Sequence, residues 1–343
     1  MAYTTINKPT EHFNTKLYTG TGSSNAITGV GFQPDWTWIK NRDTTDWHRL
    51  LDAVRGATKE LYSNENTAET TQAQSLKSFD TDGFTLGTLA EVNTSSENYA
   101  SWNWLGANGT TANTDGSISS TVSANTTSGF SIVSYTGNGS AGATIGHGLG
   151  SVPSTIFVKK ISDIGDWSSY HSTLGNTGYM RLNNNNAFAT ASTYWNNTSP
   201  DSSIFTVGTT GNINGSGNTY IAYCFAEKQG YSKIGSYVGN GNADGTFIYT
   251  GFKPAFVMLK SSTSTESWVL FDNKRLGYNP DNNGLRPDSS AVEVTDNDVD
   301  LLSNGFKMIR STGYINDSGQ TYIYMAFAEA PLVGTNNVPC TAR

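Results

Sequence analysis

Three stretches of the sequence repeat the same order of residues. Each contains a tyrosine, a glycine-rich turn, a Gly-x-x-Pro step and an apolar run that ends in lysine; the three versions are LYTGTGSSNAITGVGFQPDWTWIK, FSIVSYTGNGSAGATIGHGLGSVPSTIFVKK and YSKIGSYVGNGNADGTFIYTGFKPAFVMLK. A chain made of copies of one unit must bury the same hydrophobic pattern each time. This internal repetition constrains the fold more than any other feature.

The repeat extends along the whole unit. The aligned positions are Tyr18, Tyr135 and Tyr237; Pro34, Pro153 and Pro254; Lys40, Lys160 and Lys260; and Trp47, Trp167 and Trp268. Each unit closes with a polar motif that ends in tyrosine, at residues 93–99, 214–220 and 316–322. The alignment predicts three domains, at residues 1–104, 130–229 and 230–343.

Residues 105–129 separate the first unit from the second. They are mostly Gly, Asn, Ser and Thr, which predicts a flexible or extended linker with one short strand at 118–122. Only Lys228, Gln229 and Gly230 separate the second unit from the third. We therefore expect the first unit to be separable and the other two to pack as a pair.

Composition and strand patterns indicate an all-β fold. Charged residues make up 14% of the chain and aromatic residues 12%, and glycine occurs 36 times. The runs TIFVKK, AFVMLK, TYIAYCFAE and TYIYMAFAE are rich in β-branched and aromatic residues and lie between Gly, Asn or Pro. The sequence predicts three tandem β-sandwich repeats with jelly-roll-like connectivity.

Charge and hydropathy exclude several classes of partner. The net charge of −7 disfavours nucleic acid, because such binding depends on Lys and Arg at the phosphates. We expect no membrane insertion, because no apolar run approaches the length of a spanning helix. The sequence also lacks a secretory signal, contains no cofactor motif and places Cys224 in an apolar run where we expect burial.

The repeated tryptophans and two histidines are the candidate ligand-binding residues. Trp47, Trp167 and Trp268 lie beside hydrogen-bonding side chains, and His48 and His171 follow two of them closely. Exposed tryptophans here would form a stacking platform for a sugar or a partner. Internal duplication copies core positions as readily as sites, so a buried tryptophan in each unit is the alternative and the favoured interpretation.

Acidic residues offer the only route to bond-breaking chemistry. Candidate carboxylates lie near the repeated tryptophans and after closing strands: Asp46, Asp52, Asp166, Glu227, Glu266 and Asp272. Asp296, Asp298 and Asp300 have the spacing of a calcium loop, but Leu301 occupies the position where such loops need glycine. We expect neither a catalytic residue nor a bound metal.

The run from residue 116 to 160 resembles a repeat domain of marine bacteriophage virion proteins. The pattern continues through Trp167 and the closing INGSGNTYIAYCFAEKQGYSKIGSYVGNG. The resemblance implies a virion location and a non-enzymatic role, as a short tail fibre or surface adhesin that contacts a host glycan or protein. A capsid or tail decoration protein bound to other virion subunits is the alternative, and a polysaccharide depolymerase is a distant third. Phage fibres also suggest a homo-oligomer, with a trimer favoured.

Overall fold

The chain folds almost entirely into β-strands, as predicted. The structure is a computed structural model that describes residues 2–275, 279, 282–296, 298–336 and 338–339. Its helices are a 3-10 turn, η1 (Pro9–Glu11), and two single turns, α1 (Ala90–Asn93) and α2 (Ser192–Trp195). No helix in the described part of the chain has the length and apolar character needed to cross a membrane.

The first unit contains two facing sheets. Its strands are β1 (Phe13–Thr19), β2 (Asn25–Thr28), β3 (Trp36–Asn41), β4 (Arg49–Asp52), β5 (Lys59–Glu60), β6 (Thr70–Thr71), β7 (Leu76–Asp80), β8 (Gly83–Leu86) and β9 (Asn98–Trp104). One sheet has the order β1-β9-β3-β4 and the other β2-β8-β7, with β5 and β6 as a separate pair. We call the first the inner sheet and the second the outer sheet.

The second unit and the segment before it repeat this order inside a longer sheet. The strands are β10 (Thr111–Asn113), β11 (Ser120–Asn125), β12 (Phe130–Thr136), β13 (Ala143–Gly146), β14 (Thr155–Lys160), β15 (Ser168–His171), β16 (Gly175–Met180), β17 (Ala189–Thr190), β18 (Ile204–Val207) and β19 (Thr219–Phe225). The inner sheet is β12-β19-β14-β15, extended by β11 and β10 at one edge and by β16 and β17 at the other, and β13 pairs with β18 outside.

The third unit has the same inner order. Its strands are β20 (Ser232–Val238), β21 (Phe247–Tyr249), β22 (Phe252–Ser261), β23 (Val269–Asp272), β24 (Asn282–Gly284), β25 (Val294–Asp296), β26 (Val299–Leu302), β27 (Gly305–Met308) and β28 (Thr321–Pro331). The inner sheet is β20-β28-β22-β23 and the outer sheet β21-β27-β26. In all three units the first strand of the inner sheet therefore pairs with the last.

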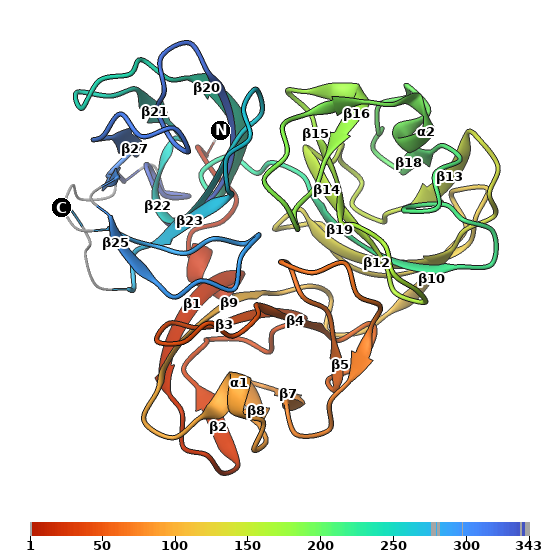
Figure 1. Cartoon of the computed structure of the whole chain (residues 1–343), viewed down its shortest axis with the longest axis horizontal. Coiled ribbons are helices and arrows are strands. Elements are labelled where there is room, and N and C mark those ends of the chain that lie inside the picture. The colour runs from red at the N-terminus through yellow and green to blue at the C-terminus, as the bar shows by residue number, and fades with distance from the viewer. Residues whose placement is uncertain (1, 276–278, 280–281, 297, 337, 340–343) are drawn as a thin grey trace.

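The three units surround one axis, with the inner sheets toward the centre and the outer sheets at the rim (Figure 1). Trp104, Phe225 and Phe327 occupy equivalent positions near the ends of β9, β19 and β28 and meet at this axis. Their ring centroids lie 6.3 Å (Trp104 to Phe225), 5.7 Å (Trp104 to Phe327) and 5.8 Å (Phe225 to Phe327) apart. The edge-to-face and tilted geometry is favourable for aromatic pairs. One chain thus forms a ring with approximate threefold symmetry.

Strand alternation explains how one sheet supplies two cores. In β3, Trp36 and Trp38 belong to a cluster shared by all three units, whereas Ile39 belongs to the cluster between the sheets of the first unit. Successive side chains point to opposite faces of a strand, so an inner sheet that is apolar on both faces must be covered on both. Its second face is covered by the other two units.

This shared cluster argues against the expectation that the first unit is separable. Removing the first unit would expose Phe130, Tyr223 and Phe225, which are buried against it. The sequence could not reveal this, because duplication produces the same apolar strands whether the units are strung out or closed into a ring.

The predicted linker is also ordered. Residues 120–125 form β11, which pairs with β12 along its whole length, and β10 pairs with β11. The start of the segment is held by the first unit, where the carboxylate of Asp35 accepts the backbone N–H groups of Gly106 at 2.7 Å and Asn108 at 3.1 Å. The Thr- and Ser-rich segment thus adds two strands, β10 and β11, to the inner sheet of the second unit.

The closing motif has one structural role in all units. The side chain of Asn93 donates to the carbonyls of Gly87 and Ser23, and Tyr99 stacks on Tyr18 with ring centroids 5.0 Å apart. The other units repeat these interactions with Asn214 and Asn316, and with the tyrosine pairs Tyr135–Tyr220 and Tyr237–Tyr322. All three asparagines are fully buried.

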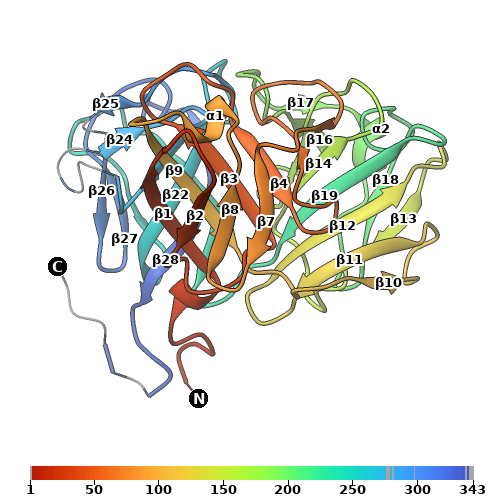
Figure 2. The ribbon, with the colours of Figure 1, turned by 90° about the horizontal axis from the view of Figure 1, so that it is seen from below.

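Both terminal segments lie at the same end of the ring, as Figure 2 shows. The hydroxyl of Tyr3 donates to the carbonyl of Gly251 at 2.8 Å, and the backbone N–H of Thr335 donates to Asn7 at 3.3 Å. The opposite end carries α1, α2 and the loops that follow β3, β14 and β22 (Figure 2).

Candidate functional site

Two of the repeated tryptophans join neighbouring units. The indole N–H of Trp167, just before β15, donates to the carbonyl of Tyr62 in the first unit at 2.8 Å. In the same way Trp268, just before β23, donates to Arg181 of the second unit at 2.8 Å. Both side chains are buried. They are junction residues and have no exposed ring face on which a ligand could stack.

His48, one residue after Trp47, is the true equivalent in the first unit. Strand register identifies the equivalent residues: the fourth strand of each inner sheet has Leu50 opposite Trp38, Ser169 opposite Phe157 and Leu270 opposite Met258. His48, Trp167 and Trp268 each lie two residues before these positions. His48 Nε2 lies 3.0 Å from the carbonyl oxygen of Arg286 in the third unit. The three contacts therefore run around the ring and close it.

Geometry fixes the tautomer of His48. The indole N–H of Trp38 can only donate, so Nδ1 of His48, at 2.9 Å, accepts from it. The carbonyl of Arg286 can only accept, so Nε2 carries the proton. Burial lowers the pKa of His48 well below its usual value, and the nearby Lys40 ammonium lowers it further. His48 is thus a neutral bridge between units and cannot act as a proton donor and acceptor at a surface.

Trp47 is the one tryptophan of the chain on the surface. Its residue is 40% exposed, and its ring lies edge-on to Tyr62 with centroids 5.1 Å apart. The neighbouring Asp46 accepts hydrogen bonds from Asn41 and Thr44. Of the five candidate ligand-binding residues, only Trp47 is accessible. Trp167 and Trp268 are buried, as the favoured interpretation expects, and the alternative of a stacking platform made of repeated tryptophans does not form.

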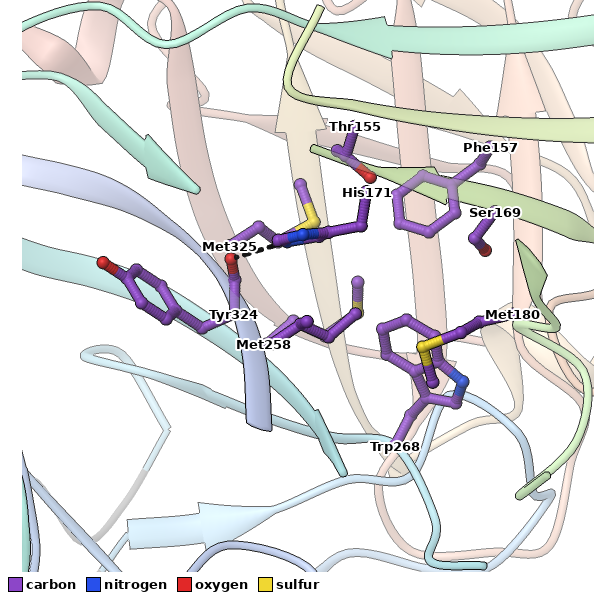
Figure 3. A pocket seen from close by; sticks show the side chains of 10 residues that line it. Thr155, Phe157, Ser169, His171, Met180, Met258, Trp268, Tyr324 and Met325 are labelled. Carbon is purple, nitrogen blue, oxygen red and sulfur yellow. Dashed lines mark hydrogen bonds between the residues drawn. The ribbon is translucent and has the colours of Figure 1, made fainter. Parts of the chain in front are cut away.

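His171 lies at the junction between the second and third units, beside a small apolar cavity (Figure 3). Its Nε2 is 3.4 Å from the carbonyl of Tyr324, and its Nδ1 is 2.9 Å from the hydroxyl of Thr173. Burial lowers the pKa of His171 to about 4. The cavity, lined largely by Met180, Met258, Met325, Phe157 and Trp268, has a volume of about 10 Å³, enough for one water molecule at most.

The other two junctions contain buried ionic networks. Asp52 pairs with Arg55 at 2.5 Å and accepts the hydroxyl of Tyr223 from the second unit at 2.7 Å. Asp272 pairs with Arg275 at 2.7 Å and accepts the indole N–H of Trp102 from the first unit at 3.0 Å. The equivalent of these aspartates in the second unit is His171, where the junction is apolar.

A second acid completes each network. Glu69 pairs with Arg55 at 3.3 Å and Glu293 pairs with Arg275 at 3.1 Å. The backbone N–H of each glutamate also donates to the next unit: Glu69 to Ile161 at 3.0 Å and Glu293 to Arg42 at 3.1 Å. Removing one member of such a network should destabilise the fold, because it leaves a buried ion without its partner.

The remaining acidic candidates are dispersed. Asp166 pairs with Arg181 at 3.2 Å, Glu227 pairs with Lys233 at 2.8 Å, and Glu266 follows β22 in the third unit. Asp52 and Asp272 are committed to junction arginines in different units. The six carboxylates therefore do not gather in one cleft.

The acidic run near residue 300 is partly described. Asp298 is buried, accepts the hydroxyl of Tyr314 at 3.0 Å and lies 3.7 Å from Arg310. Asp300 lies opposite Lys307 in the register of β26 and β27. The side chain of Asp296 lies outside the described residues. Among those that are described, no group of three or more metal-ligating side chains occurs.

The three-unit ring coincides with one known family. A family model described as a domain of unknown function, DUF7483, matches residues 8–331. The chain belongs to this family. The match covers all three units of this chain at once. No curated protein matches the chain.

The DUF7483 ring also contains three buried lysines that the sequence alignment misplaced in one unit. Register pairs Lys40 with Ala100, Lys159 with Ile221 and Lys260 with Ile323, so Lys159, and not Lys160, is the equivalent residue. Each ammonium donates to the carbonyl of the next residue, at 2.6 to 2.7 Å, and to a second carbonyl.

These lysines hold the loops at the end of the ring opposite the terminal segments. The second acceptors are Thr44 and Ser264 in the lysine's own loop, and Asn66 of the first unit for Lys159. Burial lowers the pKa of Lys159 to about 7 and those of Lys40 and Lys260 to about 8. A repeated lysine directly after an apolar strand was the sequence signal for this role.

Proposed function

We propose that this protein is a non-enzymatic component of a bacteriophage particle, serving as a short tail fibre or surface adhesin that contacts the host envelope. The observation that carries the proposal is the closed ring, with both terminal segments at one end and loops of all three units at the other (Figure 2). Such a body can be attached at one end while it presents a rigid, three-sided surface at the other.

The phage assignment is supported by the resemblance of residues 116–160 to repeat domains of marine phage virion proteins. The same proposal includes the finer description of the units as three tandem jelly-roll-like repeats, which the recurrent inner-sheet order supports. The approximate threefold symmetry of one chain would also match a threefold-symmetric attachment site on a particle, because a single copy offers the surface that a trimer would offer.

The chemistry of the junctions favours a structural role over catalysis. The histidines and acids that could perform acid-base chemistry are engaged elsewhere: His48 bridges two units, and Asp52 and Asp272 neutralise buried arginines. A depolymerase would need two opposed carboxylates about 5 to 10 Å apart around a sugar. Asp52 and Asp272 instead bond across the junctions, to Tyr223 and Trp102.

The alternative within the same class is a decoration protein that binds other virion subunits. Exposed apolar side chains on the third unit, Val238, Phe247 and Tyr249, favour a protein partner there. Host and virion contacts are compatible, since they would use different faces of the ring.

Two measurements test the proposal. Negative-stain electron microscopy of virions with an antibody to this protein should label the particle, at the tail tip for an adhesin and at the head for a decoration protein. Incubation of purified protein with host surface polysaccharide should release no reducing ends. Absence of the protein from purified virions, or release of oligosaccharide that disappears with Asp166→Asn or Glu227→Gln, would overturn it.

A further inference from the structure

One outer strand recurs in the three units with the same buried centre. Ile27 in β2, Ile145 in β13 and Ile248 in β21 are all buried, and each pairs with a phenylalanine of the neighbouring strand: Phe84, Phe205 and Phe306. The residues on either side of each isoleucine are therefore equivalent as well, and their side chains point away from the core.

These flanking residues differ between the units. They are Ala26 and Thr28 in the first unit, Thr144 and Gly146 in the second, and Phe247 and Tyr249 in the third. Phe247 is 45% exposed and Tyr249 is 53% exposed. The nearby Val238, at the end of β20, is 57% exposed, and its equivalents are Thr19 and Thr136. Only the third unit thus places large apolar groups around this strand. Within the chain, the hydroxyl of Tyr249 contacts the side chain of Tyr3.

The second unit shows what such a strand can bind. Residues 116–120 of the chain lie along the free edge of β13, where Ile118 forms a parallel bridge with Ile145 and is itself buried. The backbone N–H of Ile118 donates to the carbonyl of Thr144 at 3.0 Å. The backbone N–H of Ser117 donates to the hydroxyl of Thr144 at 2.8 Å, and the backbone N–H of Thr144 donates to the hydroxyl of Ser117 at 2.9 Å. An extended segment with an isoleucine at its centre therefore completes this edge.

In the third unit the same edge is open in the described part of the chain. β21 pairs only with β27 there, and it lies at the rim of the ring (Figure 1). The carbonyl of Thr246 and the N–H of Thr250 bond inward, to Met308 at 3.0 Å and Asn304 at 3.0 Å. Because backbone groups alternate in an antiparallel ladder, those of Phe247 and Tyr249 point to the open edge. An unpaired edge with apolar side chains is a template for strand addition.

We propose that β21 binds an extended segment of a partner protein, added parallel to β21 as residues 116–120 are to β13. A central isoleucine or valine would lie beside Ile248, as Ile118 lies beside Ile145. The residues on either side of it would lie against Phe247 and Tyr249, so they are apolar where the chain's own segment has serine. The partner is therefore a β-branched, weakly charged strand. The inference does not depend on the phage assignment.

A synthetic peptide provides the probe. It has the sequence of residues 112–124 with Ser117→Val and Ser119→Val, which makes its outer positions apolar, and it carries a fluorophore for anisotropy. The unaltered peptide of residues 112–124 is the matched control, because its serines suit Thr144 and Gly146. We expect saturable binding of the valine peptide to the full-length protein, and binding at least about tenfold weaker for the control.

The first unit supplies the matched variant of the protein. Phe247→Ala combined with Tyr249→Thr gives β21 the residues that β2 already carries. Peptide affinity should fall at least about tenfold, while the thermal transition stays cooperative and shifts little, because the variant loses only surface contacts such as that of Tyr249 with Tyr3. Phe247→Pro should also abolish binding, because it removes the N–H that points to the edge.

Three outcomes would overturn the proposal. One is no saturable binding of the valine peptide up to about 1 mM, the affinity of the weakest specific complexes. Another is binding that the double variant does not weaken. The third is self-association of the protein that the double variant abolishes and the peptide does not compete with, because it would identify a second copy of this chain as the occupant.

Discussion

The indole nitrogen of Trp102 lies 3.0 Å from the carboxylate of Asp272, and this hydrogen bond joins the first unit to the third. Both residues are buried, and the same carboxylate holds Arg275. No peptide linker joins these two units, so the ring closes only through contacts of this kind. The equivalent bond between Tyr223 and Asp52 joins units that are also connected by residues 105–129.

Removing the acid at this closure should strongly destabilise the protein. Asp272→Ala leaves Arg275 without its closest carboxylate and Trp102 without its acceptor. We expect a loss of about 3 to 5 kcal/mol in the free energy of unfolding, as for other broken buried pairs. Lys8→Ala, which removes an exposed pair with Glu11, should cost less than about 1 kcal/mol. Denaturant titration measures both, and equal effects would contradict the role of Asp272.

The second and third units should not fold cooperatively alone. A fragment of residues 130–343 exposes the aromatic face that the first unit covers, so it should aggregate or show a broad thermal transition. Co-expression with residues 1–129 should restore a sharp transition and a stable complex, because the interface is a shared core. A monomeric 130–343 fragment with a cooperative transition by calorimetry would show that the shared core is dispensable.

Trp167 and Trp47 should differ sharply in their contribution to stability. Trp167→Ala removes a fully buried ring and its bond to Tyr62, and should cost about 3 to 5 kcal/mol. Trp47→Ala removes a ring on the surface and should cost less than about 1 kcal/mol. Urea unfolding of the two variants provides the comparison. Acrylamide should quench the fluorescence of Trp47 selectively, and uniform quenching of all tryptophans would contradict the buried positions.

Stability should fall as the pH drops from about 6.5 to about 4. Burial lowers the pKa of all four histidines, including His48 and His171, so in this window these side chains bind protons more readily in the unfolded chain than in the folded protein. Burial also raises the pKa of Asp288 to about 6, which opposes the trend at one site. Each group contributes at most about 1.4 kcal/mol per pH unit. His171→Gln should flatten the profile of unfolding free energy against pH, and an unchanged slope would exclude His171 as a contributor.

The buried lysines should raise stability as the pH increases from about 8 to about 10. Their pKa values are lowered on folding, so in this window the unfolded chain holds protons that the folded one has released. Above about pH 10 ionisation of tyrosines in the unfolded chain should reverse the trend. Lys159→Met should reduce the alkaline rise, whereas the exposed Lys8→Met should leave it intact. Thermal unfolding across this pH range measures the effect.

Local structure could be predicted from the sequence to a useful degree. The β-class, the repeat, the closing tyrosines and the burial of Cys224 all follow from residue patterns, because strand alternation and turn residues act over short distances. The alignment failed by one residue at Trp47 and at Lys160. In both cases a similar residue stood next to the true equivalent, and only strand register distinguishes neighbours that point to opposite faces.

Ring closure could not be predicted in the same way. Trp36 and Trp38 give an apolar strand whether the face opposite the outer sheet meets another unit of the same chain or a partner. For the same reason the sequence alone could not decide whether the candidate ligand-binding tryptophans are exposed. Trp167 and Trp268 have polar neighbours in sequence, as surface aromatics do, but the backbone N–H of Trp167 donates to Asn183 and the indole N–H of Trp268 donates to the carbonyl of Arg181.

The presence of three units in one chain has an evolutionary consequence. In a homotrimer every substitution appears at all three corners at once, because one gene encodes them. Here histidine replaces tryptophan at one corner, an apolar junction replaces an ionic network at another, and aromatic residues mark one outer strand, while the other copies keep the body intact. Each corner can therefore acquire its own partner without the other two having to accept the same change.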